Sequence, residues 1–566
     1  MTGRRTLLIV LLAAAVVPYF VNLGATSIID ANEAFYAETP REMIESGNYI
    51  TPTFNYEPRL NKPPLSYWVV AAFYRVSGAS LGAARLPIAL GAIVILVTAF
   101  LLGRQAFSTD AGLLAAITLA ATPRMLLFSR RIIIDVYTAM FVGLTLLFFV
   151  LAETEPERRR RWLIAMYVSA ALGVLTKGPV AVAIPALVFG VYLVLAGRLR
   201  TIARLMLPTG AVVMAAIIVP YYAALHAQQG WGAISGFLLE ENLARFAEGV
   251  GAPDRGPLFY LPVVFADLYF PWSLLLPAAL VLAPWRSVLA GRGWARVWGD
   301  ATDDGAAVSR ERVRLLLGLW IGLIVVFFSL SKGQQDLYVL PFVAAGAALV
   351  GGLVDGWVRR AWSSRLDSMT TGSAGLAGSV LVVLGVAAVW LVGGTVGRIH
   401  LAGAGAAGMA IAAGGVAALV WLVRRRPFGA VASLAAALIV AHWVLVVWAL
   451  PDFERYKPVP QLARVIQQTS GPRPIVGTYL VAAPSLVFYL RQHVTEMFDE
   501  GQLSVFLTSN PTALCVMRDE DYDTVRSRIA VPMRVVARAP RFDAGLLDFL
   551  GRSPLPTLVL VTPAHP

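Results

Sequence analysis

Acidic and basic side chains recur near the ends of the long apolar segments of this 566-residue chain. A carboxylate can take the proton of an attacking hydroxyl or amine, while Lys or Arg stabilises an anionic leaving group. Transfer of a sugar from a phosphate-linked donor needs both, and its oxocarbenium-like transition state also benefits from a nearby carboxylate. The chain has no GxxxxGK[ST] phosphate loop, which argues against ATP-driven chemistry. We expect the following residues to lie on one face: Asp30, Glu33, Glu38, Arg41, Glu42, Lys62, Arg130, Arg131, Asp135, Lys177, Glu240, Glu241, Arg245, Asp267, Lys332 and Asp336.

Three of these lysines share a local pattern. Lys62 precedes two prolines in NKPPLSYW, and Lys177 precedes Gly-Pro in VLTKGPVA. Lys332 lies in SKGQQDLYVLP, where Tyr338 follows. Proline is tolerated in the first turn of a helix and Gly-Pro favours a turn, so each lysine would sit at the end of a stiff segment. All three lysines could face a single anionic group, although Lys177 fits equally well as a cation at the C-terminal end of a helix dipole.

The composition indicates which type of secondary structure positions these charged residues. Hydrophobic residues make up 58% of the chain, charged residues 14%, and the mean hydropathy is +0.69. Soluble domains are about 45–50% apolar and about 25% charged, so we predict a polytopic helical membrane protein. The net charge of +13 fits arginines on the cytoplasmic side of a membrane better than nucleic-acid binding. Cys515 is the only cysteine, which excludes an internal disulfide.

Segments long enough to cross a bilayer predict about 13 helices. They cover residues 6–23, 83–104, 111–129, 133–152, 162–176, 179–197, 204–226, 257–284, 313–331, 337–357, 374–394, 402–423 and 429–450. With a cytoplasmic N-terminus, most arginine clusters fall on the cytoplasmic side. This topology predicts an inner-membrane protein whose functional loops and final segment are periplasmic.

We divide the chain into a transmembrane domain, residues 1–450, and a small periplasmic α/β domain, residues 451–566. In the tail, β-prone runs such as 474–479, 513–517 and 557–561 alternate with a helical run at 459–468. Two outer connections, 24–82 and 227–256, are too long to be simple turns. Their amphipathic and aromatic stretches predict helices that lie at the membrane interface.

Several stretches together resemble a known family. They are DANEAFYAETPREMIESGNYITP, NKPPLSYW, RRIIIDVYTAMF, LTKGP, EENLARFAEG, FYLPVVFADLYFPWSLLLP and SKGQQDLYVLP, and they span roughly residues 1–345. In this order they resemble the GT-C superfamily of integral-membrane glycosyltransferases. The sequence is most similar to the bacterial branch of the lipid A aminoarabinose transferase, which is related to protein O-mannosyltransferases.

The resemblance implies a polyprenyl-phosphate sugar donor, used on the periplasmic face, and a lipid A, envelope-glycan or protein acceptor. Asn32 stands where the family has its presumed catalytic Asp, so Asp30 or Glu33 would be the base, and we favour Asp30. Asp135 would orient the acceptor or the sugar, and Tyr36 could stack on the sugar or the isoprenoid. The residues expected on the donor phosphate side are Lys62, Lys177, Arg245, Lys332 and Tyr338.

Two departures from the family pattern bear on metal binding and on the identity of the transferred sugar. Asn61 and Asn242 stand where aminoarabinose transferases often have Glu and His, and two Asn residues would be poor zinc ligands. We therefore predict no structural zinc there, assign no cofactor, and expect a sugar other than aminoarabinose. Two alternatives stay open at this point: a transporter or flippase of lipid-linked sugars, and a catalytically inactive relative.

Overall fold

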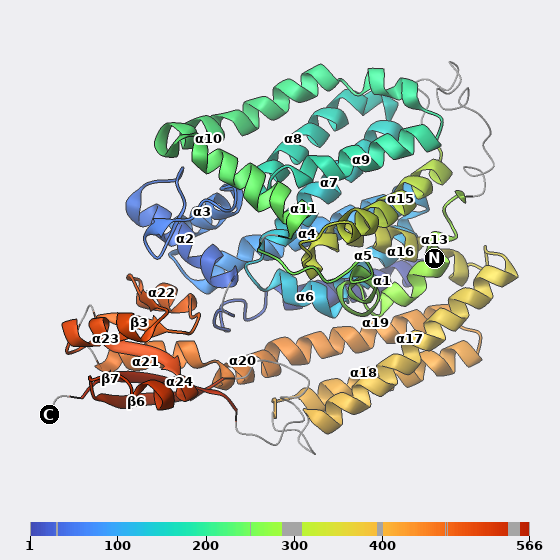
Figure 1. Cartoon of the computed structure of the whole chain (residues 1–566). Helices are drawn as coiled ribbons and strands as arrows, with labels where there is room; N and C mark the ends of the chain where they lie inside the picture. Colours follow the sequence, from blue (N-terminus) through green and yellow to red (C-terminus); the bar gives the residue numbers. More distant parts are fainter. Residues whose placement is uncertain are drawn as a thin grey trace.

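The computed structural model describes residues 2–29, 32–249, 251–285, 308–392, 400–469, 471, 474–541 and 555–564. Most of them are helical (Figure 1). The longer helices are α1 (Thr2–Val16), α2 (Asn32–Ser46), α3 (Leu65–Ser77), α4 (Leu81–Ala106), α5 (Thr109–Ala120), α6 (Pro123–Ser129), α7 (Ile134–Thr154), α8 (Arg159–Lys177), α9 (Val180–Leu195), α10 (Leu207–Ser235), α15 (Arg310–Ser329), α16 (Val343–Val358), α17 (Ser364–Leu391), α18 (Ala404–Val423) and α19 (Pro427–Val444).

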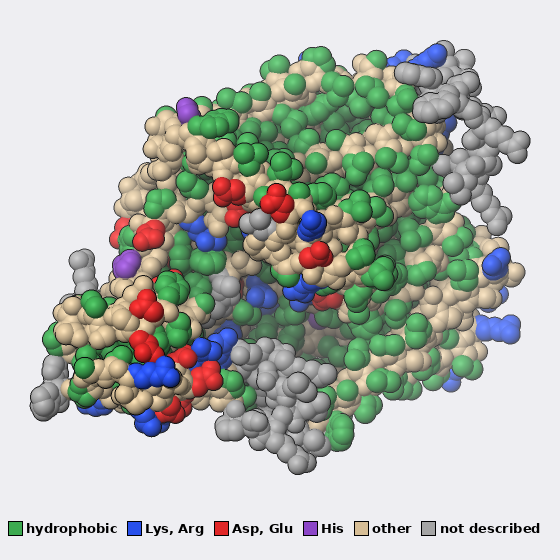
Figure 2. Space-filling view, in the orientation of Figure 1, with side chains coloured by type: hydrophobic (Ala, Val, Ile, Leu, Met, Phe, Trp, Pro, Cys, Tyr) green, Lys and Arg blue, Asp and Glu red, His purple; other side chains and the backbone are tan. Residues whose placement is uncertain are grey.

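The described residues include eight helices that are long and apolar enough to cross a membrane, or up to ten if each bent helix pair is one span. They pack side by side, and apolar side chains cover much of the outer surface (Figures 1 and 2). Burial within the bundle differs widely: the apolar window of the helix over residues 336–358 is 89% buried, whereas that of α18 is 17% buried. An apolar helix left this exposed is stable only where lipid surrounds it. The chain is therefore a multi-pass membrane protein.

The first long connection contains two helices and a short hairpin. Helices α2 and α3 pack against each other, and the hairpin β1 (Thr53–Phe54) and β2 (Glu57–Pro58) lies between them in sequence. The second long connection continues α10 as a π-helical segment, Gly236–Ala244, followed by α11 (Arg245–Glu248). Helices thus form in both connections, and they hold polar residues at one end of the bundle.

The C-terminal segment forms a five-stranded sheet of order β4-β3-β5-β7-β6. Its elements are α21 (Pro458–Thr469), β3 (Val476–Tyr479), α22 (Ser485–Leu490), β4 (Thr495–Met497), α23 (Glu500–Ser509), β5 (Leu514–Arg518), α24 (Asp519–Val525), β6 (Met533–Pro540) and β7 (Thr557–Pro563). Strands β3, β4 and β5 are parallel, whereas β7 pairs antiparallel with both β5 and β6.

Alternation along the strands creates two small cores, one on each face of this sheet. In β5, Leu514 and Val516 pack with α21 and α22, whereas Cys515 and Met517 pack with α23 and α24. The β-prone runs at 474–479, 513–517 and 557–561 thus coincide with β3, β5 and β7.

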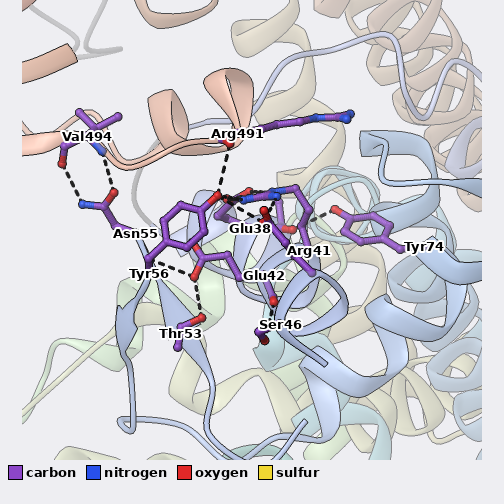
Figure 3. Close-up of polar contacts among 12 residues, drawn as sticks. Glu38, Arg41, Glu42, Ser46, Thr53, Asn55, Tyr56, Tyr74, Arg491 and Val494 are labelled. Atoms are coloured by element: carbon purple, nitrogen blue, oxygen red, sulfur yellow. Dashed lines mark hydrogen bonds and ion pairs between the residues drawn. The ribbon is translucent and has the colours of Figure 1, made fainter. Parts of the chain in front are cut away.

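The sheet region contacts the first long connection directly (Figure 3). The Asn55 amide donates to the Val494 carbonyl oxygen at 2.8 Å and accepts from the Val494 amide nitrogen at 2.9 Å. The Tyr489 hydroxyl accepts from the Ile28 amide nitrogen at 2.8 Å. On the connection itself, the buried Glu38 carboxylate accepts from Arg41. These contacts tie residues 24–82 to the sheet region.

Candidate active site

A cavity of about 840 Å³ lies where α2, the α6–α7 and α8–α9 turns and residues 238–246 meet. On the face drawn in Figure 2, Lys and Arg side chains lie within a hollow between the helices and the sheet region. Among the described lining residues, the basic ones are Arg59, Lys62, Arg124, Arg131, Lys177 and Arg245, and the acidic ones are Glu33, Asp135, Glu241 and Asp336. The surplus of basic groups favours an anionic ligand.

Part of the wall is apolar. It includes Val142, Ile184, Phe327, Phe328 and Pro341. A charged region next to an apolar wall suits an amphipathic ligand, with a polar head among the charges and a hydrocarbon chain along the wall.

Lys62 and Arg245 are brought together by a shared acid. The Lys62 Nζ lies 3.0 Å from a Glu241 carboxylate oxygen, and an Arg245 guanidinium nitrogen lies 3.1 Å from the same oxygen. Lys62 comes just before α3, as the two prolines predicted, whereas Arg245 begins α11 one turn after Glu241. Burial lowers the pKa of the Lys62 ammonium, and the Glu241 carboxylate opposes that shift. Two cations from separate loops therefore converge on a single point in the cavity.

Asp135, Lys177 and Tyr338 form a second contact group. Asp135 lies in the first turn of α7 and Lys177 is the last residue of α8, so each charge complements its helix dipole. The Lys177 ammonium donates to the Asp135 carboxylate and lies 4.5 Å from the centroid of the Tyr338 ring. Gly178 ends α8 at φ +98°, and a Cβ there would lie 2.8 Å from the Phe237 ring. A residue with a Cβ is therefore disfavoured at position 178.

Glu33, which also lines the cavity, accepts several hydrogen bonds. Its carboxylate accepts from Arg85 Nε at 2.9 Å and from the backbone nitrogens of Ile29 and Ile132 at 2.9 and 3.2 Å. Burial alone would raise the pKa of Glu33, but the Arg85 guanidinium and the backbone donors hold it below its ordinary value. A carboxylate with a lowered pKa and saturated acceptors is a weak base. This geometry argues for a positioning role rather than for the predicted catalytic one.

The remaining predicted residues fall into three groups. Tyr36 lines the cavity and stacks on Tyr67 at 5.4 Å between ring centroids. Asp30 lies outside the described residues. Lys332 is exposed and does not line the cavity, because its backbone nitrogen donates to the Phe246 carbonyl and fixes the turn against α11. The structure therefore places Lys332 outside the cavity, and its segment forms backbone hydrogen bonds with Phe246 and Arg245.

Three cavity arginines had no role assigned from the sequence, although Arg131 was among the charged residues expected on one face. Arg59 lies 3.7 Å from the centroid of the Phe35 ring. Arg124 contacts Asp336 at 2.5 Å and Asp267 at 3.2 Å, and Arg131 follows α6. The Thr-Pro pair at the start of α6 is a sequence signal for a helix that contains Arg124. Only the bend between α5 and α6, however, turns that helix towards the cavity.

Asn61 and Asn242 both line the cavity. The Asn242 amide donates to the Phe237 carbonyl at 2.7 Å, while the Asn61 amide oxygen is buried without a hydrogen-bond partner. Within the part of the chain that the structure describes, no group of three His, Cys, Asp or Glu residues could hold a metal ion. Neutral amides at these two positions are poor zinc ligands, so the expected absence of zinc stays a prediction.

Comparison with known proteins gives consistent results. Residues 61–223 match the family described as dolichyl-phosphate-mannose-protein mannosyltransferase. A relative from Pseudomonas fluorescens (strain Pf0-1), named undecaprenyl phosphate-alpha-4-amino-4-deoxy-L-arabinose arabinosyl transferase 1, is 27% identical over 62% of this chain and 58% of its own length. A Pseudomonas aeruginosa PAO1 protein, named as an arabinosyl transferase of the same kind, is 27% identical over 97% of this chain and 96% of its own.

One solved structure has the same fold. It is that of ArnT from Cupriavidus metallidurans bound to undecaprenyl phosphate, with a TM-score of 0.74, 23% identity, and coverage of 99% of this chain and 98% of that one. The fold and the cavity define a multi-pass membrane protein with a charged cavity at one end of its helices. The chain is similar in sequence to undecaprenyl phosphate aminoarabinose arabinosyl transferases, and it shares the fold of the Cupriavidus metallidurans protein.

Proposed function

We propose that this protein transfers a sugar from a polyprenyl-phosphate donor to a lipid A, envelope-glycan or protein acceptor. The observation that carries the proposal is the convergence of Lys62 and Arg245 on one point of a cavity with surplus positive charge. The names of the arabinosyl transferase relatives support the same class of reaction.

In the proposed complex, Lys62 and Arg245 hold the donor phosphate, and Lys177 and Tyr338 complete its surroundings. Preorganised cationic groups around the leaving phosphate stabilise the negative charge that develops as the glycosidic bond breaks. The apolar wall near Phe327 takes the first isoprene units of the chain. Tyr36 lies where it can contact the sugar.

The acids have different roles in this proposal. Glu33 orders the start of α2 through Arg85, and Asp135 orients Lys177. Asp30 remains a candidate base. A single displacement at the anomeric carbon requires no covalent intermediate and predicts inversion.

The finer architecture and location are also proposals. We propose about 13 spans, an inner-membrane location, and a periplasmic active site with residues 451–566 as a periplasmic domain. The sheet formed by that segment and its contacts with the first long connection support this placement. The two asparagines favour a sugar other than aminoarabinose.

The test uses purified full-length protein in lipid nanodiscs, supplied with undecaprenyl-phosphate sugars and candidate acceptors. We expect a new glycosidic bond by mass spectrometry, and a loss of about 10- to 100-fold in transfer for Lys62→Ala. Lys332→Ala is the matched control, because it removes a lysine that does not line the cavity.

Two outcomes would contradict the proposal. Movement of the donor across the membrane without a new bond would indicate a transporter of lipid-linked sugars. Donor binding without either transfer or transport would indicate an inactive relative.

A further inference from the structure

Glu241 stands between the donor cavity and a second groove. This groove, of about 730 Å³, runs between the β1–β2 hairpin and the end of α10, with Phe54 and Gln229 among its lining residues. The side chains common to the cavity and the groove are Arg59, Asn61 and Glu241. Among the described residues that line them, Glu241 is the one acid that borders both.

The other described acids of the cavity pair with groups other than Lys62 and Arg245, and none of them lines the groove. Glu33 is held by Arg85, which does not line the cavity, and by two backbone donors. Asp336 pairs with Arg124, and Asp135 pairs with Lys177 away from the groove. Glu241 differs because both of its cationic partners, Lys62 and Arg245, are the groups assigned above to the donor phosphate.

A phosphate at this point competes directly with the Glu241 carboxylate. Both anions would use the Lys62 ammonium and the Arg245 guanidinium, and a phosphate offers more oxygens to an arginine fork. The Glu241 side chain is 25% exposed, so it has room to move towards the groove. Once displaced, it would be a carboxylate without its two cations, directly beside the bound donor.

We propose that the donor phosphate displaces Glu241 from Lys62 and Arg245, and that the freed carboxylate is the base for an acceptor arriving through the groove. This inference rests on the proposed function. Glu241 takes the proton of the acceptor's hydroxyl or amine while that oxygen or nitrogen bonds to the anomeric carbon. The bond from the anomeric carbon to the phosphate oxygen breaks, and its electron pair stays on the phosphate.

The charges balance across this step. The donor is a phosphodiester with one negative charge, and the leaving prenyl phosphate gains one more. Glu241 loses one negative charge as it takes the proton. The total charge near Lys62 and Arg245 is therefore unchanged, so the cations need no further counter-ion when the product forms. Return of the proton to solvent restores the carboxylate, which then competes with the product phosphate and aids its release.

The experiment compares Glu241→Gln with the wild type in nanodiscs, using undecaprenyl phosphate for binding and the undecaprenyl-phosphate sugar for transfer. We expect the two readouts to move in opposite directions. Undecaprenyl phosphate should bind at least about threefold more tightly, because the competing charge is gone. The kcat of transfer should fall by about 100-fold or more, as expected for loss of a general base.

Two further variants separate this mechanism from a structural role. Glu241→Asp keeps a carboxylate, so its kcat should be at least about tenfold higher than that of Glu241→Gln. Glu248→Gln removes an exposed acid from the same segment, outside both cavities, and should change neither readout.

Weaker undecaprenyl-phosphate binding by Glu241→Gln would overturn the displacement, because the acid would then be supporting the site. Transfer within about threefold of wild type would overturn the role as base. Both results leave the proposed function intact as long as the wild-type protein forms the glycosidic bond. A wild-type protein that forms no bond would overturn the proposed function and this inference together.

Discussion

Two groups of ion pairs lie at opposite ends of the helices and differ in what their charges face. At the end where the chain begins, away from the sheet region, Asp110 and Asp355 are 4% and 5% exposed (Figure 1). Asp110 pairs with Arg5 at 2.7 Å, and Asp355 pairs with Arg359 at 2.8 Å. The Ser108 hydroxyl donates to Asp355 at 2.7 Å, so the buried acids are well satisfied.

At the other end, Lys62, Glu241 and Arg245 form pairs of similar length beside the cavity. The N-terminal group borders neither the cavity nor the groove, and its carboxylates join α1, α5 and α16. The two groups contain the same types of residue. They differ because the cavity adjoins only the group of Lys62, Glu241 and Arg245. An ion pair with adjoining free volume can exchange one partner for a ligand, whereas one enclosed by helices holds the helices together.

The largest effect we expect comes from Glu33 and Arg85, a pair that borders the cavity and whose two side chains are 1% and 2% exposed. Removing the Glu33 carboxylate with Glu33→Ala leaves the Arg85 guanidinium buried, and breaking such a pair costs about 3–5 kcal/mol. Chemical unfolding in detergent measures the loss, with Arg85→Ala and the double variant completing a cycle.

The pH dependence of that loss has a defined sign. Because the pKa of Glu33 is lowered in the folded protein, its stabilisation is present above the ordinary Glu range and disappears as pH falls through the folded value. The difference between wild type and Glu33→Ala should therefore shrink in acid. A loss below about 1 kcal/mol at neutral pH would place this pair among weak, surface-like pairs.

An intermediate effect is expected for the exchangeable pair when pH rises. Burial lowers the pKa of Lys62, so it should lose its proton below the ordinary Lys value of about 10.4. Undecaprenyl-phosphate affinity should then fall several-fold as pH rises from neutral towards the ordinary Lys value, since the phosphate itself is already ionised there. Lys62→Arg keeps its charge throughout this range and should flatten the curve. An unchanged curve in Lys62→Arg would assign the dependence to another group.

The smallest effect is expected at the N-terminal group. The Arg5 side chain is 48% exposed, so Arg5→Ala should change the free energy of unfolding by about 0–1 kcal/mol. Undecaprenyl-phosphate affinity should be the same as for wild type, measured in parallel with Lys62→Ala. A change in affinity would instead show that the ion pairs at the two ends of the bundle are coupled.

Much of the architecture was predictable because it follows local patterns. Runs of apolar residues predicted a multi-pass helical protein, and the β-prone run 513–517 predicted β5. Lys62 and Lys177 were predicted to sit at helix ends from adjacent Pro and Gly, and both line the cavity. Lys332 has a similar local setting but points outward, because hydrogen bonds to Arg245 and Phe246 orient its turn.

The sequence by itself determined the class of protein, its helical segments and the set of charged residues gathered at one end, because hydropathy and turn residues act over short distances. Only the tertiary structure decided which charges meet: Glu33 with Arg85, 52 residues away, and Lys62 with Glu241, 179 residues away. The strength of an ion pair and its ability to exchange depend on burial and on neighbouring free volume. Those quantities exist only after distant helices have packed together.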